Sequence, residues 1–144
     1  MLRKVNITNL GFLFLIQVNL FVFCHKSNSK TELWTHPVPD VAKTTAVYGE
    51  IQNQTESEIS ILSLKSNHYK TVEFHTMVED KDGIMRMRKL EFPVSLKPKE
   101  SIRLERNGTH LMLYDKQYMD GELEISIQYS NGTVKKQVVE KKSL

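Results

Sequence analysis

Cysteine is almost missing from this sequence. The only one, Cys24, ends an apolar segment near the N-terminus. Exported domains often use disulfides as staples, and a chain with one cysteine cannot form one internally. The remaining chain must rely on its hydrophobic core, for which about 115 residues suffice. The scarcity of thiolate also argues against a blue-copper electron carrier, which needs a cysteine beside its histidines.

A hydrophobic run long enough to span a membrane is also lacking. Leu10–Cys24 is apolar, but its length of about 15 residues falls short of the roughly 20 that a spanning helix needs. It follows a short basic head and precedes small polar residues, which is the order of a secretory signal peptide. We predict cleavage after Ser29, giving a signal peptide at 1–29 and one domain at 30–144. The alternatives are an uncleaved membrane anchor or a lipid attached to Cys24.

The predicted mature domain has no excess charge of either sign. The whole chain has 20 basic and 17 acidic residues, and removal of Arg3, Lys4 and Lys26 with the leader leaves 17 of each. We therefore expect neither nucleic acid nor an acidic membrane surface as a partner. The sequence also lacks a G-x-S-x-G elbow, an H-E-x-x-H helix and a phosphate loop. We expect no enzymatic activity and no small-molecule substrate.

No segment has a helical stripe longer than two turns, and period-2 alternation dominates instead. Alternation of this kind is typical of half-buried strands. The clearest case is 123–129, and in 59–64 the pattern places Leu62 and Leu64 on one face, opposite Ile59 and Ile61. Turn pairs such as Asp-Gly and Asn-Gly recur at short intervals, as in a sandwich or barrel. The further strands are predicted at 46–51, 72–77, 101–105 and 134–139.

Methionine and histidine are concentrated in one part of the chain. Four of the six methionines and two of the five histidines fall between residues 75 and 112, in three pairs with i, i+2 spacing. Residues at i and i+2 of a strand point to the same face. His110 and Met112 can therefore project together while Leu111 and Leu113 enter the core. The three pairs are His75-Thr76-Met77, Met85-Arg86-Met87 and His110-Leu111-Met112.

Thioether sulfur is a soft, neutral donor and imidazole is a borderline one. Such donors suit Cu(I) and disfavour calcium or magnesium, which prefer oxygen ligands. Two neutral nitrogens and two neutral sulfurs would leave the complex at +1, which favours the cuprous state. Methionine is also an ordinary filler of cores, but a core role does not require both histidines to share a face with a methionine. We therefore predict a Cu(I) site.

The loop after His75 offers a geometric test of this prediction. Residues 79–83 resemble a hairpin loop in which Gly83 supplies a positive φ. A five-residue loop here would place Met87 directly across from His75. A two-residue turn would instead place Met87 on the opposite face, because the side-chain period of a strand is two. The Cu(I) hypothesis therefore predicts a loop with an odd number of residues, or a bulge.

These segments resemble the periplasmic copper chaperones of the PCu(A)C type, which serve the CuA centre of cytochrome c oxidase. The resemblance covers nearly all of Leu33 to Val139. It implies a cupredoxin-like Greek-key β-sandwich that holds Cu(I) near its surface. The implied ligands are His75, Met87, His110 and Met112, with Met85 and Met77 in reserve. The segments that carry it are His75-Thr76-Met77, Gly83-Ile84-Met85-Arg86-Met87-Arg88 and Gly108-Thr109-His110-Leu111-Met112-Leu113.

The resemblance implies transfer of copper between proteins in the periplasm. We expect a monomer that exchanges copper with a donor and an acceptor, the latter being cytochrome c oxidase subunit II or another copper chaperone. The alternative is an exported binding or adhesion module without metal. Asn53, Asn107 and Asn131 begin triplets that match the N-glycosylation pattern. We interpret them as turn residues.

Overall fold

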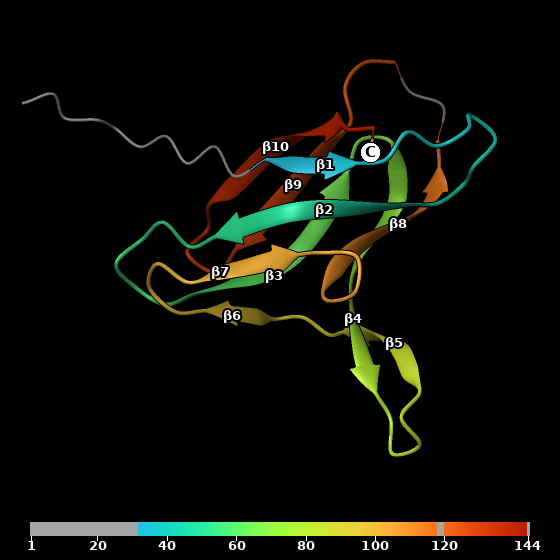
Figure 1. Cartoon of the computed structure of the whole chain (residues 1–144). Coiled ribbons are helices and arrows are strands. Elements are labelled where there is room, and N and C mark those ends of the chain that lie inside the picture. The colour runs from blue at the N-terminus through green and yellow to red at the C-terminus, as the bar shows by residue number, and fades with distance from the viewer. Residues whose placement is uncertain (1–31, 118–119, 144) are drawn as a thin grey trace, which may run out of the picture.

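The computed structural model describes residues 32–117 and 120–143, so the predicted signal peptide, with Cys24, lies outside the described residues. In that part of the chain all regular elements are β-strands (Figure 1). They are β1 (Leu33–Thr35), β2 (Thr45–Gln52), β3 (Ile59–Ser66), β4 (Tyr69–Glu79), β5 (Met85–Leu90), β6 (Val94–Leu96), β7 (Ser101–Leu104), β8 (His110–Lys116), β9 (Glu124–Tyr129) and β10 (Val134–Lys141).

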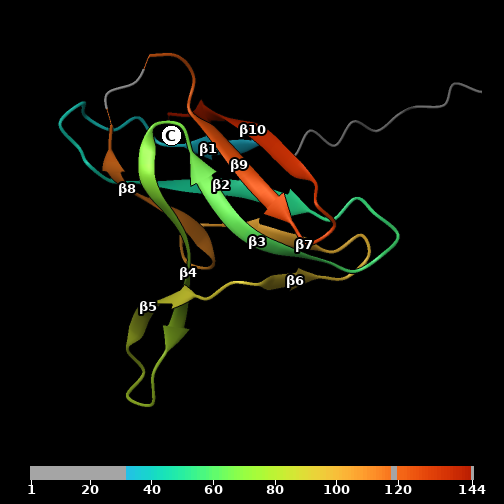
Figure 2. The same cartoon turned by 180° about the vertical axis from the view of Figure 1, so that it is seen from behind.

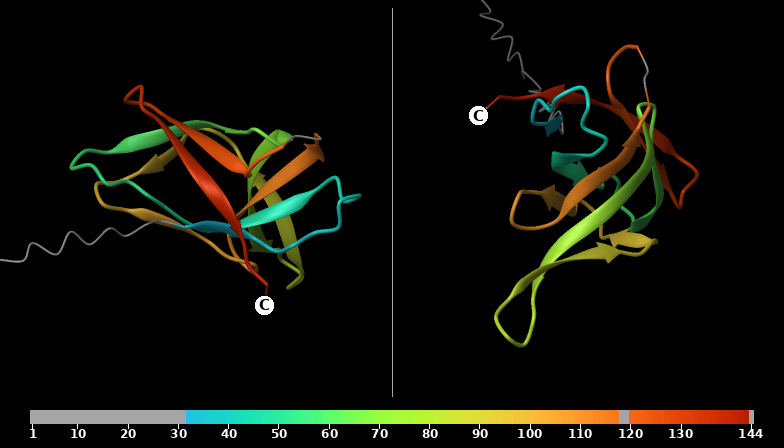
Figure 3. Two further views of the ribbon diagram at one scale, coloured as in Figure 1. Left: turned by 90° about the horizontal axis from the view of Figure 1, so that it is seen from above. Right: turned by 90° about the vertical axis from the view of Figure 1, so that its right-hand side faces the viewer.

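The strands form one mixed sheet. Its order is β5-β4-β8-β2-β1-β10-β9-β3-β6, and β7 pairs with β2 outside this path. The short strand β1 joins the two halves, because it runs antiparallel to β2 and parallel to β10. Figure 3 shows how the sheet curls so that its halves face each other. The predicted all-β sandwich class is confirmed.

A single hydrophobic core lies between the two halves of the sheet. Val47, Phe74 and Leu111 reach it from β2, β4 and β8, and Ile61 and Ile127 reach it from β3 and β9. All five side chains are fully buried. Because side chains alternate along a strand, the residues between them point to the outside. The core residues of β4 and β8 therefore determine which side chains of these strands point away from the core.

The prediction for β3 is wrong at one position. Leu62 was expected to share a face with Leu64, opposite Ile61. In the structure the pairing of β3 with β9 shifts register between Ile61 and Ser63. The irregularity moves Leu64 to the core side with Ile61 and leaves Leu62 42% exposed. A bulge of this kind adds one residue to one strand and reverses the alternation after it.

A glycine allows β1 to approach β2. Gly49 has φ +128°, and a Cβ placed there would lie 2.2 Å from the backbone oxygen of Glu32. Any larger residue would push β1 away from its neighbour. The close approach matters for the outer face, because it places Trp34 directly opposite Tyr48.

The β4–β5 hairpin projects beyond the rest of the sheet (Figures 1 and 2). β5 is an edge strand that pairs only with β4 along the path of the sheet. Its residues from Met85 to Lys89 are all exposed. The hairpin therefore contributes little to the core, and the side chains at its end face solvent.

Candidate metal centre

His75 and His110 lie directly opposite each other on β4 and β8. Their ring centroids are 6.2 Å apart. Glu73 and Met112 also lie opposite each other. Each is two residues from the histidine of its own strand, so both side chains point to the same face as the two histidines. We call this the histidine face: the side of β5, β4, β8, β2 and β1 that is turned away from the core and carries the two histidines. The structure thus brings together three of the four predicted ligands.

The two histidines are held in place by burial. His110 is only 4% exposed although it points away from the hydrophobic core. The ring of Tyr48 lies 6.3 Å from its ring on one side, and His75 lies on the other. The side chain of His75 is 12% exposed, and Met112 is half-buried. Buried donors that face one another are a suitable arrangement for a metal ion with few ligands.

The ring of His110 has a defined hydrogen-bond partner. Its Nδ1 lies 3.2 Å from the backbone oxygen of Gly108. A carbonyl oxygen can only accept, so Nδ1 carries the hydrogen and donates it. In a neutral imidazole the other nitrogen, Nε2, then keeps its lone pair. The backbone of the β7–β8 loop therefore selects the tautomer in which Nε2 of His110 can bind a metal.

The ring of His75 is fixed by a carboxylate. Its Nε2 lies 2.9 Å from Oε2 of Glu73, whose Oε1 in turn lies 3.0 Å from Nζ of Lys89. The hydrogen bond from His75, followed by that from Lys89, holds the pKa of Glu73 below its ordinary value. An ionised carboxylate accepts only, so Nε2 of His75 donates. Its Nδ1 is buried and, among the described residues, has no hydrogen-bond partner.

The loop between β4 and β5 has five residues, Asp80 to Ile84, as the Cu(I) hypothesis predicted. The carboxylate of Asp80 organises it by accepting hydrogen bonds from the backbone nitrogens of Asp82 and Ile84, at 3.0 and 2.9 Å, and from Nε of Arg86 at 2.5 Å. The predicted loop has the right length but begins one residue too early. This displacement changes the partners of the residues that follow.

One predicted pairing is wrong. His75 lies opposite Lys89, and Met87 lies opposite Met77 rather than opposite His75. Because the loop has an odd number of residues, Met87 and Met77 still point to the histidine face. Met85 lies one further step towards the tip, opposite Glu79. Met87 and Met77 are therefore both two residues from the histidine row, but Met77 is on β4 beside β8, whereas Met87 is one strand farther from His110, and Met85 is nearer the tip of the hairpin.

The family model that describes LpqE-like proteins, and names them as lipoproteins, matches residues 29–119. The chain belongs to the LpqE-like family. That match spans more than half of the chain and includes all the histidine and methionine pairs. Comparison with curated proteins finds no significant match.

Solved structures show the same fold at low sequence identity. The apo PCuAC domain from PmoF1 has a TM-score of 0.59 and 19% identity, over 78% of this chain and 91% of that one. The copper-bound PCuAC domain from PmoF2 has a TM-score of 0.59 and 15% identity, over 78% and 90%. The Cu(I) form of DR1885 from Deinococcus radiodurans has a TM-score of 0.55 and 17% identity, over 77% and 75%. The predicted resemblance to PCu(A)C domains is confirmed for the fold.

Several residues that support the histidines were not predicted from the sequence. One row of side chains crosses the histidine face from β5 to β1. It consists of Lys89, His75, His110, Tyr48 and Trp34, in which Tyr48 contacts the ring of His110 and lies opposite Trp34. The ring centroids of Trp34 and Tyr48 are 4.9 Å apart. The i, i+2 rule applied to His75 would have found Glu73. No local signal identifies Trp34, because its place depends on the pairing of β1.

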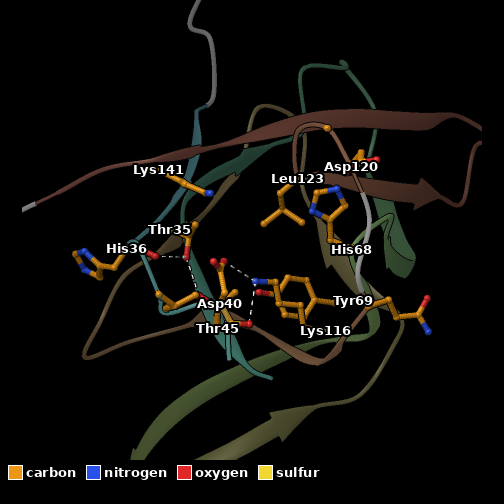
Figure 4. Close-up of a pocket in the computed structure, with 13 residues that line it drawn as sticks. Thr35, His36, Asp40, Thr45, His68, Tyr69, Lys116, Asp120, Leu123 and Lys141 are labelled. Atoms are coloured by element: carbon orange, nitrogen blue, oxygen red, sulfur yellow. Dashed lines mark hydrogen bonds and ion pairs between the residues drawn. The ribbon is translucent and has the colours of Figure 1, made fainter. Parts of the chain in front are cut away.

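A pocket of the described residues lies elsewhere. Its volume is about 240 Å³. Its lining includes His68, Tyr69 and Lys116 (Figure 4). Lys116 ends β8 whereas His110 begins it, which separates them by about 20 Å at the usual rise per residue. None of the predicted metal ligands lines this pocket.

Two features are absent from the described residues. No group of three or more His, Cys, Asp or Glu side chains is placed to hold a metal ion. Methionine is not one of these residue types, so a site of two histidines and thioethers is a different kind of centre. No helix in the described part of the chain is long and apolar enough to cross a membrane.

Proposed function

We propose that this protein is an exported carrier that binds one Cu(I) ion on its histidine face and transfers it to another protein. The observation that carries the proposal is the facing pair His75 and His110. Hydrogen bonds to Glu73 and to the backbone of Gly108 leave each ring with one unprotonated nitrogen. Orientation of ligand histidines by such partners is a regular feature of metal sites.

The ligands we propose are Nδ1 of His75, Nε2 of His110 and the sulfur of Met112, with Met87 as the fourth. Met77 and Met85 are the alternatives to Met87. The register favours Met77 over Met85, because Met77 lies two residues from His75 whereas Met85 lies farther towards the tip, opposite Glu79. Neutral nitrogen and thioether donors suit Cu(I), whose filled d shell imposes little geometry. Copper is the cargo here, and we assign no catalytic step to the protein.

A copper carrier must release its ion to the acceptor without freeing it into solution. A centre at the base of a projecting hairpin allows the ligands of an acceptor to replace those of the donor one at a time. The similar folds of the copper-bound PmoF2 domain and of Cu(I)-DR1885 support a copper role. We propose that a monomer delivers the ion towards the CuA centre of cytochrome c oxidase, on subunit II or through another copper chaperone.

Export is the second part of the proposal. The leader has the order of a signal peptide, and the family description names lipoproteins. That description gives weight to the alternative in which Cys24 carries a lipid and anchors the domain. We propose a periplasmic domain, released after cleavage at Ser29 or held at the membrane through Cys24.

A competition titration tests the proposal. The apo protein is titrated with Cu(I) against a chromogenic Cu(I) chelator, beside a His110→Ala, Met112→Ala variant. We expect one tightly bound ion and a loss of affinity of at least roughly tenfold per removed ligand, about 1.4 kcal/mol each. His68→Ala is the matched control, because His68 lines the distant pocket. An unchanged affinity in the double variant would refute the site, and absence of Cu(I) binding by the wild type would favour the binding module without metal.

A further inference from the structure

Three methionines share the histidine face of the β4–β5 hairpin. Met77 and Met87 are directly paired, and Met85 lies two residues from Met87 on the same strand. Directly opposed Cβ atoms lie about 4.5–5.5 Å apart, and i, i+2 positions are separated by roughly 7 Å. The unbranched methionine side chain has three rotatable bonds and adapts readily to such distances. Three thioethers can therefore converge on one ion.

Packing does not explain Met85 and Met87. Met85 is 50% exposed and Met87 is 48% exposed, on an edge strand that contributes little to the core. Half-exposed side chains forgo much of the stabilisation that full burial gives a methionine. Arg86, which lies between these two methionines, and Arg88, which follows Met87, point to the other face of the hairpin. A soft donor set is thus presented to solvent at the end of the molecule.

The charges around the three sulfurs are compatible with a monovalent cation. Glu79 lies directly opposite Met85 on the histidine face and adds a negative charge at the outer end. Lys89 lies at the inner end, two residues from Met87, but its ammonium is paired with Glu73 at 3.0 Å. Arg86 is bound to Asp80. Lys89, the cation that the register places on the histidine face of the hairpin, is therefore paired with a carboxylate.

We propose that Met77, Met85 and Met87 form a second, outer Cu(I) site, through which the ion enters and leaves the inner site of His75, His110 and Met112. Met87 belongs to both sites and passes the ion inwards. Three neutral thioethers bind Cu(I) more weakly than a set that contains two imidazoles, so the outer site is occupied only during exchange. This inference rests on the proposed copper transport and adds a route to it.

The first test isolates the outer site. In a His75→Ala, His110→Ala variant, the methionine methyl NMR signals are followed during titration with Ag(I), a monovalent soft ion that stays in one oxidation state in air. We expect the methyl signals of Met77, Met85 and Met87 to shift together and to saturate at one ion. Addition of Met85→Leu should weaken this binding by roughly tenfold. Methyl signals that stay in place at excess Ag(I) would overturn the proposal.

The second test uses the protein with both histidines intact, so it does not depend on the folding of a multiple variant. Stopped-flow measurements follow Cu(I) uptake from a chelator in the wild type, in Met85→Leu and in Ile84→Ala. Met85→Leu removes a sulfur and keeps the apolar bulk, whereas Ile84→Ala removes exposed apolar surface from the same tip. We expect Met85→Leu alone to slow uptake and release several-fold, with its equilibrium affinity unchanged.

The outcomes separate this inference from the proposed function. If the wild type binds no Cu(I), the proposed function fails and the outer site fails with it. If binding depends on the histidines but Met85→Leu exchanges copper at the wild-type rate, only the outer site is refuted. A loss of equilibrium affinity in Met85→Leu that accounts for the slower rate would also refute it, because Met85 would then belong to the inner site.

Discussion

His75 and Glu73 are joined by a hydrogen bond of 2.9 Å between Nε2 and Oε2, which leaves the buried Nδ1 of His75 as the ring nitrogen with an available lone pair. The two residues lie two positions apart on β4 and so on one face of the sheet. The carboxylate acts on the proposed site through the histidine, as a positioning group. Its effect can be measured without copper.

Removal of the Glu73 carboxylate should change the tautomer of His75. We expect Glu73→Ala to shift the neutral ring from the Nε2–H form towards the Nδ1–H form. Long-range proton–nitrogen NMR spectra of the apo protein would show this directly. Glu73→Gln should restore the Nε2–H form, because the amide oxygen also accepts a hydrogen bond. Cu(I) affinity should follow the tautomer, and an identical tautomer in all three proteins would contradict the assignment of Nδ1.

The single tryptophan should report on metal binding. Trp34 lies 4.9 Å from Tyr48 in ring-centroid distance, and Tyr48 lies 6.3 Å from His110. A cation bound at His110 alters the surroundings of this aromatic group, so Trp34 fluorescence should change in step with the first equivalent of Cu(I) or Ag(I). The change should vanish in His110→Ala and persist in His68→Ala. A response that survives in His110→Ala would place the ion elsewhere.

Acid should loosen the hairpin loop. The hydrogen bond from Arg86, followed by that from the backbone of Ile84, lowers the pKa of Asp80 below its ordinary value of 3.8. A carboxyl whose pKa is lowered by folding contributes stability above its unfolded pKa, and that contribution is lost as the pH falls through the lowered value. The amide NMR shifts of Asp82 and Ile84 should be steady at neutral pH and move below about pH 4.

The matched variant Asp80→Asn isolates the role of this carboxylate in the loop. It keeps the side-chain size but loses the charge that binds Arg86. Its Asp82 and Ile84 amide shifts should lack the acid transition of the wild type. The same transition in the variant would show that another group near the loop is responsible.

Asn53 should be a structural residue and not a glycan acceptor. It is fully buried, and its Nδ2 donates to the backbone oxygens of Ser57, Leu96 and Lys97, while its Oδ1 accepts from Thr55. Asn53→Ala removes these hydrogen bonds, of which the one to Leu96 is fully buried, and we expect a loss of about 2–3 kcal/mol in the free energy of unfolding. Urea denaturation measures it. Asn131→Ala, on an exposed turn, is the control and should change little.

Much of the fold could be predicted from alternation, because a strand with one face in the core must alternate. The same rule placed His75, His110 and Met112 on one face, and the structure agrees. The short strands β1 and β6 were missed. Three residues are too few to show a period, and β1 is fixed by pairing with β10 at the far end of the chain.

Register was harder to predict than face. The parity of the loop was correct, so Met87 lies on the expected side, yet His75 pairs with Lys89. The hydrogen bonds of Asp80 decide where the loop begins, and alternation does not reveal such bonds. The bulge after Ile61 escaped prediction for a similar reason, since both registers of β3 offer apolar residues to the core.

X-ray absorption at the copper edge of the loaded protein is the most direct measurement of the proposed centre. We predict a cuprous edge and a first shell of two imidazole nitrogens and two thioether sulfurs. His75→Ala should remove one nitrogen and Met112→Ala one sulfur from that shell. A first shell of oxygen alone, or one that neither substitution changes, would contradict the Cu(I) site on the histidine face.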